Sequence, residues 1–119
     1  MSAAPATLAA AAGLVRACHV DDVPLGEGRA CTVAGRRIAL FRTTTGWYAI
    51  DHACPHADGP LADGIAADCS VICPLHERRF ALDTGAPIGH DGPGVAAHAV
   101  EIRGEEVLVA LAAPVAVAA

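Results

Sequence analysis

The chain carries Cys-Pro-His-Ala-Asp-Gly-Pro-Leu at residues 54–61 and Cys-Pro-Leu-His-Glu-Arg-Arg-Phe-Ala-Leu-Asp-Thr-Gly at residues 73–85, two motifs that each pair a cysteine with a histidine. The paired residues are Cys54 and His56 in the first motif, and Cys73 and His76 in the second. A proline follows each cysteine, and proline stiffens a loop by fixing φ and removing a hydrogen-bond donor. The pattern predicts two stiff loops that supply one metal centre together.

Two thiolates and two imidazoles fit two kinds of metal centre. One is a zinc ion with two sulfur and two nitrogen ligands. The other is a Rieske-type [2Fe-2S] cluster, in which two cysteines hold one iron and two histidines hold its neighbour. Structural zinc usually takes like ligands adjacent in sequence, whereas each motif here mixes the two types. The mixing favours the binuclear cluster, because both loops then reach both irons. Structural zinc and a metal-free protein remain the alternatives.

Composition excludes several classes of protein. The chain has 119 residues, of which 54% are hydrophobic, and a formal net charge of -5 at pH 7. That length fits one domain. Every basic residue is arginine, and an acidic balance without a basic cluster excludes a nucleic-acid partner. No apolar run approaches the ~20 residues that span a bilayer, so we expect no membrane partner.

The two ends of the chain are rich in alanine. We expect residues 1–13 and 112–119 to be disordered tails around a single domain at 14–111. The first tail has no positive charge ahead of its apolar stretch, so it does not resemble a signal peptide. The five cysteines are an odd number at irregular spacing, which is a poor disulfide framework. These features predict a reducing, cytoplasmic location, where thiolates more often bind metals.

Short apolar runs alternate with turns that contain glycine or proline, and no long segment shows an amphipathic helical period. Ile38 and Leu40 share one face of a predicted strand, as do Val107 and Val109. We therefore predict an all-β antiparallel sandwich or small barrel. The expected strands are residues 14–20, 30–33, 36–42, 47–51, 70–73, 79–82, 98–103 and 107–111, with a tight turn at Ala34-Gly35.

On its two motifs, the chain resembles the Rieske [2Fe-2S] family over roughly residues 14–111. It is most similar to the short members: the small subunit of assimilatory NAD(P)H nitrite reductase and the ferredoxins of ring-hydroxylating dioxygenases. The resemblance implies a fold of three stacked antiparallel sheets, with a small cluster-binding subdomain formed by the two loops. It also implies that Cys54 and Cys73 bind the inner iron, whereas His56 and His76 bind the outer iron.

The ligand set bears on the redox potential. Two ferric ions, two sulfides and two thiolates sum to zero charge, whereas four thiolates would give -2, so the histidines raise the potential into a window of roughly -150 to +300 mV. The resemblance implies that high-potential members carry a disulfide where this chain has Gly59 and Leu75. The high-potential members also carry a serine hydroxyl at the position that Arg78 occupies in this chain. Because this chain has fewer neutral hydrogen-bond donors to the cluster sulfides, we expect its redox potential to lie toward the lower end of that window.

The preferred function is one-electron transfer, as the small subunit of a cytoplasmic NAD(P)H-dependent nitrite reductase in nitrite assimilation. Cys-Pro-His and the run Gly-Pro-Leu-Ala-Asp-Gly at 59–64 favour it, since many dioxygenase ferredoxins have threonine between the first cysteine and histidine. The alternatives are the ferredoxin of a ring-hydroxylating dioxygenase and a structural zinc module. We expect a protein redox partner, no catalytic residue, and no catalysis by this chain alone.

Residues around the motifs have less specific interpretations. Many relatives have glycine directly after the second histidine, where this chain has Glu77, followed by Arg78 and Arg79. This charged run is either a solvated flank or a docking surface for the partner. His52 is expected to support the first loop or to face solvent. The remaining histidines and cysteines are expected at surface or core positions: His19, His90, His98, Cys18, Cys31 and Cys69.

Overall fold

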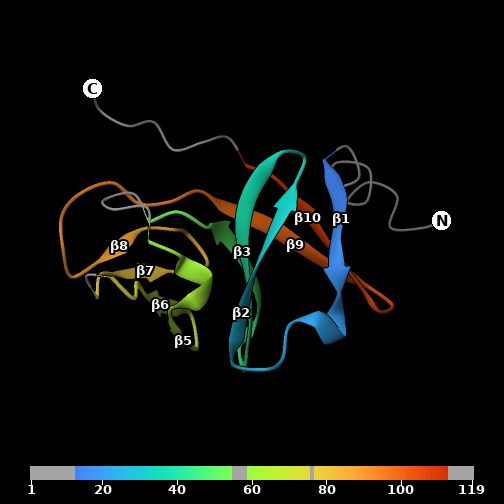
Figure 1. The fold of residues 1–119 in the computed structure, drawn as a ribbon, viewed down its shortest axis with the longest axis horizontal. Helices are drawn as coiled ribbons and strands as arrows, with labels where there is room; N and C mark the ends of the chain where they lie inside the picture. The colour runs from blue at the N-terminus through green and yellow to red at the C-terminus, as the bar shows by residue number, and fades with distance from the viewer. Residues whose placement is uncertain (1–12, 55–58, 76, 113–119) are drawn as a thin grey trace.

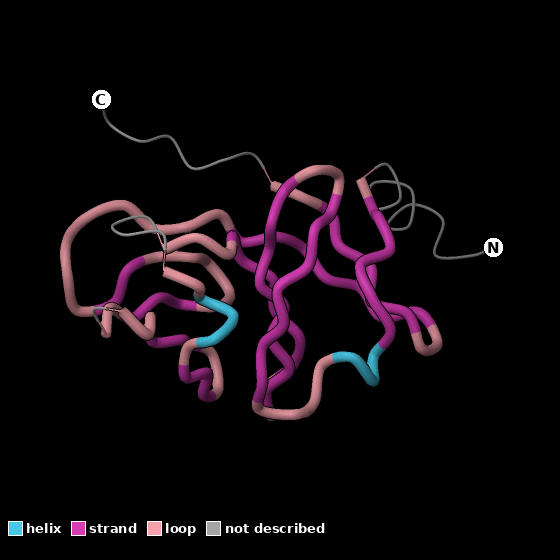
Figure 2. Tube along the Cα trace, in the orientation of Figure 1, coloured by secondary structure: helices cyan, strands magenta, loops and turns pink. Residues whose placement is uncertain are grey.

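The computed structural model describes residues 13–54, 59–75 and 77–112. In these ranges the chain forms ten strands and two short 3-10 turns, with no α-helix (Figures 1 and 2). The strands are β1 (Leu14–His19), β2 (Glu27–Val33), β3 (Arg36–Thr43), β4 (Gly46–Asp51), β5 (Ile65–Ala67), β6 (Ser70–Ile72), β7 (Arg79–Ala81), β8 (Pro87–Ile88), β9 (Ala97–Arg103) and β10 (Glu106–Ala110). The 3-10 turns are η1 (Val20–Asp22) and η2 (Leu61–Asp63). The all-β prediction is confirmed, and no helical segment in these ranges could cross a membrane.

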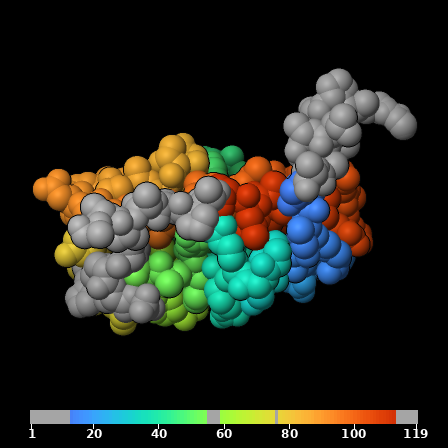
Figure 3. Space-filling view, turned by 90° about the horizontal axis from the view of Figure 1, so that it is seen from above, coloured from blue at the N-terminus to red at the C-terminus, as the bar shows by residue number. Residues whose placement is uncertain are grey.

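The strands form two antiparallel sheets. The larger has six strands in the order β1-β10-β9-β4-β3-β2, and the smaller is the meander β5-β6-β7-β8 (Figure 1). The larger sheet curls until its two edge strands, β1 and β2, contact each other. The small sheet and β1 lie at opposite ends of the molecule (Figures 1 and 3).

The described residues form two sheets where the resemblance implied three. Strand β9 accounts for the difference. It pairs with β10 along residues 99–103, and it pairs with β4 through Ala97 and His98. Because one strand bonds to both neighbours, two of the expected layers are a single continuous sheet.

Strand β3 is buried on both faces, and it separates two hydrophobic cores. Ile38 and Leu40 point into the curled large sheet, where they pack with Val107 and Val109. Ala39 and Phe41 point the other way, into the core between the two sheets. The shared face of Ile38 and Leu40 was predicted, but their neighbours were not expected to be buried, because an exposed face is the usual state of a short antiparallel strand.

Most strands lie where the sequence placed them, to within two or three residues. The turn at Ala34-Gly35 is confirmed: Val33 pairs with Arg36, and the two turn residues have φ of +49° and +83°. Strands β5 and β8 were not predicted, because β8 has only two residues and begins with proline, and β5 has a single large apolar residue, Ile65, directly after Gly64. The two predicted tails lie outside the described residues, except for Gly13 and Ala112.

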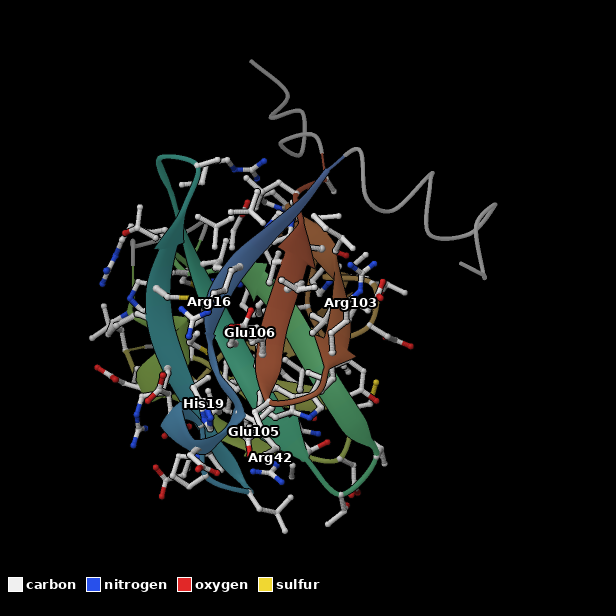
Figure 4. The ribbon with its side chains drawn as sticks, turned by 90° about the vertical axis from the view of Figure 1, so that its right-hand side faces the viewer. Arg16, His19, Arg42, Arg103, Glu105 and Glu106 are labelled. Atoms are coloured by element: carbon white, nitrogen blue, oxygen red, sulfur yellow. The ribbon has the colours of Figure 1, made fainter. Side chains whose placement is uncertain are left out.

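The end of the molecule formed by β1 and β10 carries an exposed ion pair and an exposed contact between a histidine and a carboxylate. Arg16 faces Glu106 at 3.2 Å, and His19 faces Glu105 at 3.1 Å (Figure 4). Exposed pairs of this kind stabilise a fold by less than about 1 kcal/mol each. They lie at the end of the molecule opposite the small sheet.

A half-buried polar network joins three strands of the large sheet just before the first motif. The His98 side chain is fully buried, and its Nε2 lies 2.9 Å from an Asp51 carboxylate oxygen. Arg36 donates to the same carboxylate oxygen at 2.9 Å and also to the carbonyl of Ala112. The backbone N–H of Ala112 donates to His98 Nδ1 at 2.9 Å. Since Nδ1 accepts, the proton of the neutral ring lies on Nε2. Both backbone polar groups of Ala112, its N–H and its carbonyl, are hydrogen-bonded in this network.

This network predicts a pH-dependent stability. Burial lowers the pKa of His98, although the hydrogen bond to Asp51 opposes the shift, and burial also lowers the pKa of His52. The unfolded chain therefore takes up a proton at a higher pH than the folded chain does. The free energy of unfolding should fall as the pH is lowered from about 7.5 to about 5.5, through the ordinary histidine pKa of about 6.5.

Urea denaturation across that range measures the effect in the wild type and in His98→Gln. His98→Gln should flatten the dependence, because it removes the buried ring whose pKa is lowered. An equal slope in His98→Gln and wild type would contradict this role for His98.

Candidate metal centre

The first motif begins three residues after β4, at a narrow neck. Ala53 pairs with Pro60 as an isolated antiparallel bridge, and the N–H of Cys54 donates to the carbonyl of Gly59 at 2.9 Å. One step outward, the N–H of Leu61 donates to the carbonyl of His52 at 2.9 Å. The backbone on both sides of residues 55–58 is thereby fixed, and Cys54 stands at the base of the loop.

The second motif connects β6 to β7 and is also closed at its cysteine. The N–H of Cys73 donates to the carbonyl of Arg78 at 2.7 Å, and the N–H of Glu77 donates to the carbonyl of Cys73 at 2.9 Å. Glu77 has a φ of +56°, in the left-handed region. Glycine reaches this region without the penalty that a side chain incurs, which explains physically why glycine suits the position after the second histidine.

The two motifs meet at Gly59. A Cβ added to Gly59 would lie 2.7 Å from Cys73 Sγ and 3.2 Å from Leu75 Cγ, so there is no room for a side chain there. Cys54 and Cys73 are both fully buried, and both belong to the core between the two sheets. The structure therefore places two buried sulfur donors, one from each loop, in the same core.

Four side chains were predicted to bind the metal centre, and the structure describes two of them. Cys54 and Cys73 are brought together, whereas His56 and His76 lie outside the described residues. Within the described ranges no cluster of three or more potential ligands forms. The cysteine half of the donor set suits a soft metal with two protein sulfurs, which is what one iron of a [2Fe-2S] centre requires.

One further histidine and three further cysteines contact other parts of the protein and are not among the proposed metal ligands. The ring of His52 accepts a hydrogen bond from the N–H of Ala62 at 3.4 Å, which braces the first loop against η2. Burial raises the pKa of Cys18 to about 11, with Cys31 as the second cause, and burial also raises the pKa of Cys31. Both are protonated thiols that are partly buried and pack against the core of the large sheet. Cys69 packs against the core between the sheets.

An open groove of about 560 Å³ runs past the second motif. Its walls combine apolar side chains with carboxylates and a guanidinium, and Ile65 in it is 70% exposed. The groove is lined by Asp63, Gly64, Ile65, Ile72, Cys73, Pro74, Glu77 and Arg79. Sequence reasoning missed the contribution of Ile65, because β5 is too short to give an alternating pattern.

The contact at Gly59 gives a test of the loop geometry. Gly59→Ala should force the two loops apart, because its methyl group would overlap Cys73 Sγ. We expect roughly half the bound metal of the wild type or less, and a loss of about 1–3 kcal/mol in the free energy of unfolding. Metal analysis and urea denaturation measure both quantities.

Gly13→Ala is the matched control, since its new methyl group would make an ordinary contact of 3.6 Å with Ala110 Cβ. Full metal content and wild-type stability in Gly59→Ala would show that the loops do not need this close approach.

The chain matches one protein family, and it is similar to known proteins in both sequence and structure. Residues 13–110 match the family described as Rieske-like [2Fe-2S] domain. The ferredoxin component of the naphthalene 1,2-dioxygenase system from Pseudomonas aeruginosa is 30% identical over 101 residues, which cover 82% of this chain and 94% of that protein. The solved ferredoxin of carbazole 1,9a-dioxygenase from Nocardioides aromaticivorans superposes with a TM-score of 0.76 at 33% identity, covering 83% of this chain and 98% of that one.

Two further structures are similar. A Mycobacterium tuberculosis chain assigned as the small subunit of an NADH-dependent nitrite reductase has a TM-score of 0.77 at 25% identity, covering 84% of this chain and 96% of that one. A chain in the complex of reduced oxygenase and oxidized ferredoxin of carbazole 1,9a-dioxygenase has a TM-score of 0.74 at 26% identity, covering 82% of this chain and 93% of that one.

Proposed function

This chain belongs to the Rieske-like [2Fe-2S] domain family, and from that premise we propose that it delivers single electrons to the oxygenase of a ring-hydroxylating dioxygenase system. Its cofactor is a Rieske-type [2Fe-2S] cluster, which supplies one-electron redox chemistry when bound. The observation that carries the proposal is the 30% identity to a dioxygenase ferredoxin over 94% of that protein's length.

The proposed ligands are one cysteine and one histidine from each motif. Cys54 and Cys73 hold one iron, and His56 and His76 hold the other. Three features support this assignment: both cysteines are fully buried, the loop necks fix both backbones, and Gly59 lets the loops approach at Cys73 Sγ. Family membership favours this centre over the zinc module, since a Rieske centre uses this set of two sulfurs and two nitrogens.

The oxygenase setting replaces the nitrite reductase setting as the preferred one. Backbone similarity does not separate the two, because the TM-scores are 0.76 and 0.77. Sequence identity favours the dioxygenase setting, because it is 33% to the dioxygenase ferredoxin and 25% to the nitrite reductase chain. A ferredoxin of this fold is also known in complex with its oxygenase, which supports a protein partner of that class. The cytoplasmic location stays a prediction.

The groove beside Cys73 supports a docking role for Arg79. Arg79 is exposed on β7 and lines the groove together with Glu77 and the exposed Ile65. Mixed charge around an apolar centre is the usual composition of a transient interface, where charge sets the rate of encounter. A partner seated there would lie next to one of the two proposed sulfur ligands.

The ligand assignment predicts the effect of four substitutions. Protein purified without air should contain about two iron atoms and two sulfides per chain. His56→Ala, His76→Ala, Cys54→Ser and Cys73→Ser should each lose the visible absorption of the cluster, whereas His19→Ala and Cys69→Ser should keep it. Iron analysis and absorption spectra measure this. A wild-type protein that holds zinc in place of iron, or a His76→Ala variant with an unchanged spectrum, would refute the assignment.

The choice of partner is tested by electron transfer to two acceptors. The reduced protein should reduce the oxygenase component of a ring-hydroxylating dioxygenase at least about tenfold faster than the sirohaem and flavin subunit of a nitrite reductase, as the higher identity to a dioxygenase ferredoxin leads us to expect. Arg79→Glu should slow the faster reaction several-fold without changing the redox potential. Stopped-flow absorption measures both rates. The opposite preference between acceptors would restore the nitrite reductase setting.

A further inference from the structure

Arg78 has a buried hydrogen-bond donor that is not paired with any described residue. In the part of the chain that the structure describes, its Nε is the one buried side-chain nitrogen or oxygen without a hydrogen-bond partner. Buried N–H groups are nearly always paired, because an unmade hydrogen bond leaves the cost of desolvation uncompensated. The orphaned donor therefore indicates that an acceptor other than the described residues belongs beside it.

Backbone hydrogen bonding places Arg78 at the metal centre. Its carbonyl accepts from the N–H of Cys73 at 2.7 Å, so the two residues face each other across the neck of the second loop. The Arg78 side chain starts directly opposite one proposed sulfur ligand. Its neighbour Arg79 is exposed on β7 and lines the groove, so the two arginines have different surroundings.

A histidine from the segment after β8 holds the far end of the guanidinium. Arg78 Nη1 lies 3.3 Å from His90 Nδ1, and His90 Nε2 lies 3.0 Å from the carbonyl of Arg79. Arginine can only donate, so for these two bonds Nδ1 accepts and Nε2 donates. The His90 ring also stands edge-on to Phe80, with centroids 5.4 Å apart. His90 is thus a positioning residue that occupies one guanidinium nitrogen and leaves the Nε–H to point elsewhere.

We propose that the Nε–H of Arg78 donates to a sulfur of the [2Fe-2S] centre and that its guanidinium charge raises the redox potential of that centre. This inference rests on the ligand assignment proposed above. The oxidised centre has zero net charge and the reduced centre has -1, so a fixed positive charge and a directed N–H both stabilise the reduced state. The effect is large where water is excluded and small for a screened surface charge.

The proposal revises the expectation for the potential. The position of Arg78 lacks the neutral hydroxyl that the family resemblance associates with a high potential, but it supplies a charged donor in its place. A charge-assisted hydrogen bond is stronger than a neutral one. The potential should therefore lie above the lower end of the window for these centres.

Three substitutions separate charge, donor and surface effects. Arg78→Gln removes the charge, Arg78→Lys keeps the charge but removes Nε, and Arg79→Gln removes the exposed charge next in sequence. Redox titration followed by absorption, with iron content determined on the same samples, measures the midpoint potential of each full-length protein. The electron paramagnetic resonance spectrum of the reduced state reports any change at the centre itself.

We expect Arg78→Gln to lower the ratio of reduced to oxidised protein at a fixed potential about tenfold, which is about 59 mV for one electron. Arg78→Lys should fall between Arg78→Gln and the wild type, and Arg79→Gln should change the ratio less than about twofold. Equal shifts in Arg78→Gln and Arg79→Gln would overturn the proposal. So would loss of the cluster in both Arg78 variants, since Arg78 would then serve assembly. A wild-type protein without a one-electron centre would instead refute the proposed function.

Discussion

The close approach of two loops at Gly59 is the constraint on which the site depends. The proposed assignment requires a sulfur from each loop to reach the same metal, and the loops can approach this closely because no side chain stands between Gly59 and Cys73 Sγ. The backbone hydrogen bonds at the two loop necks hold Cys54 and Cys73 at fixed positions. The core between the sheets buries both cysteines, so the same packing that joins the sheets also shields the two proposed sulfur ligands from water.

The sequence predicts those parts of the molecule that depend on local chemistry. Each motif is a continuous run of residues, so its donor types can be identified from the sequence, and the structure places the two cysteines in one core. The Ala34-Gly35 turn and the alternation of Ile38 and Leu40 are likewise properties of a few neighbouring residues. Prediction failed where distant segments decide the outcome. Strand β9 joins two expected sheets into one, and nothing local to it shows that it has two partners.

The same reasoning explains what was missed at the site. Arg78 and Arg79 are adjacent and chemically identical, so the sequence treats them as one charged run. The fold separates them, because alternate residues entering a strand point to opposite sides. One guanidinium is held by His90 and leaves a buried donor, whereas the other is exposed on the groove. A single charged run thus supports two proposals, one for the potential of the centre and one for the encounter with its partner.

The central claim is that two histidines and two cysteines, one of each from each loop, hold a binuclear iron centre. Pulsed electron paramagnetic resonance of the reduced protein, with ¹⁵N incorporated into histidine only, tests it most directly. The account predicts strong hyperfine coupling from two histidine nitrogens, and loss of the paramagnetic centre in His56→Ala and His76→Ala. A spectrum with no histidine coupling, or one that keeps two coupled nitrogens in either variant, would contradict it.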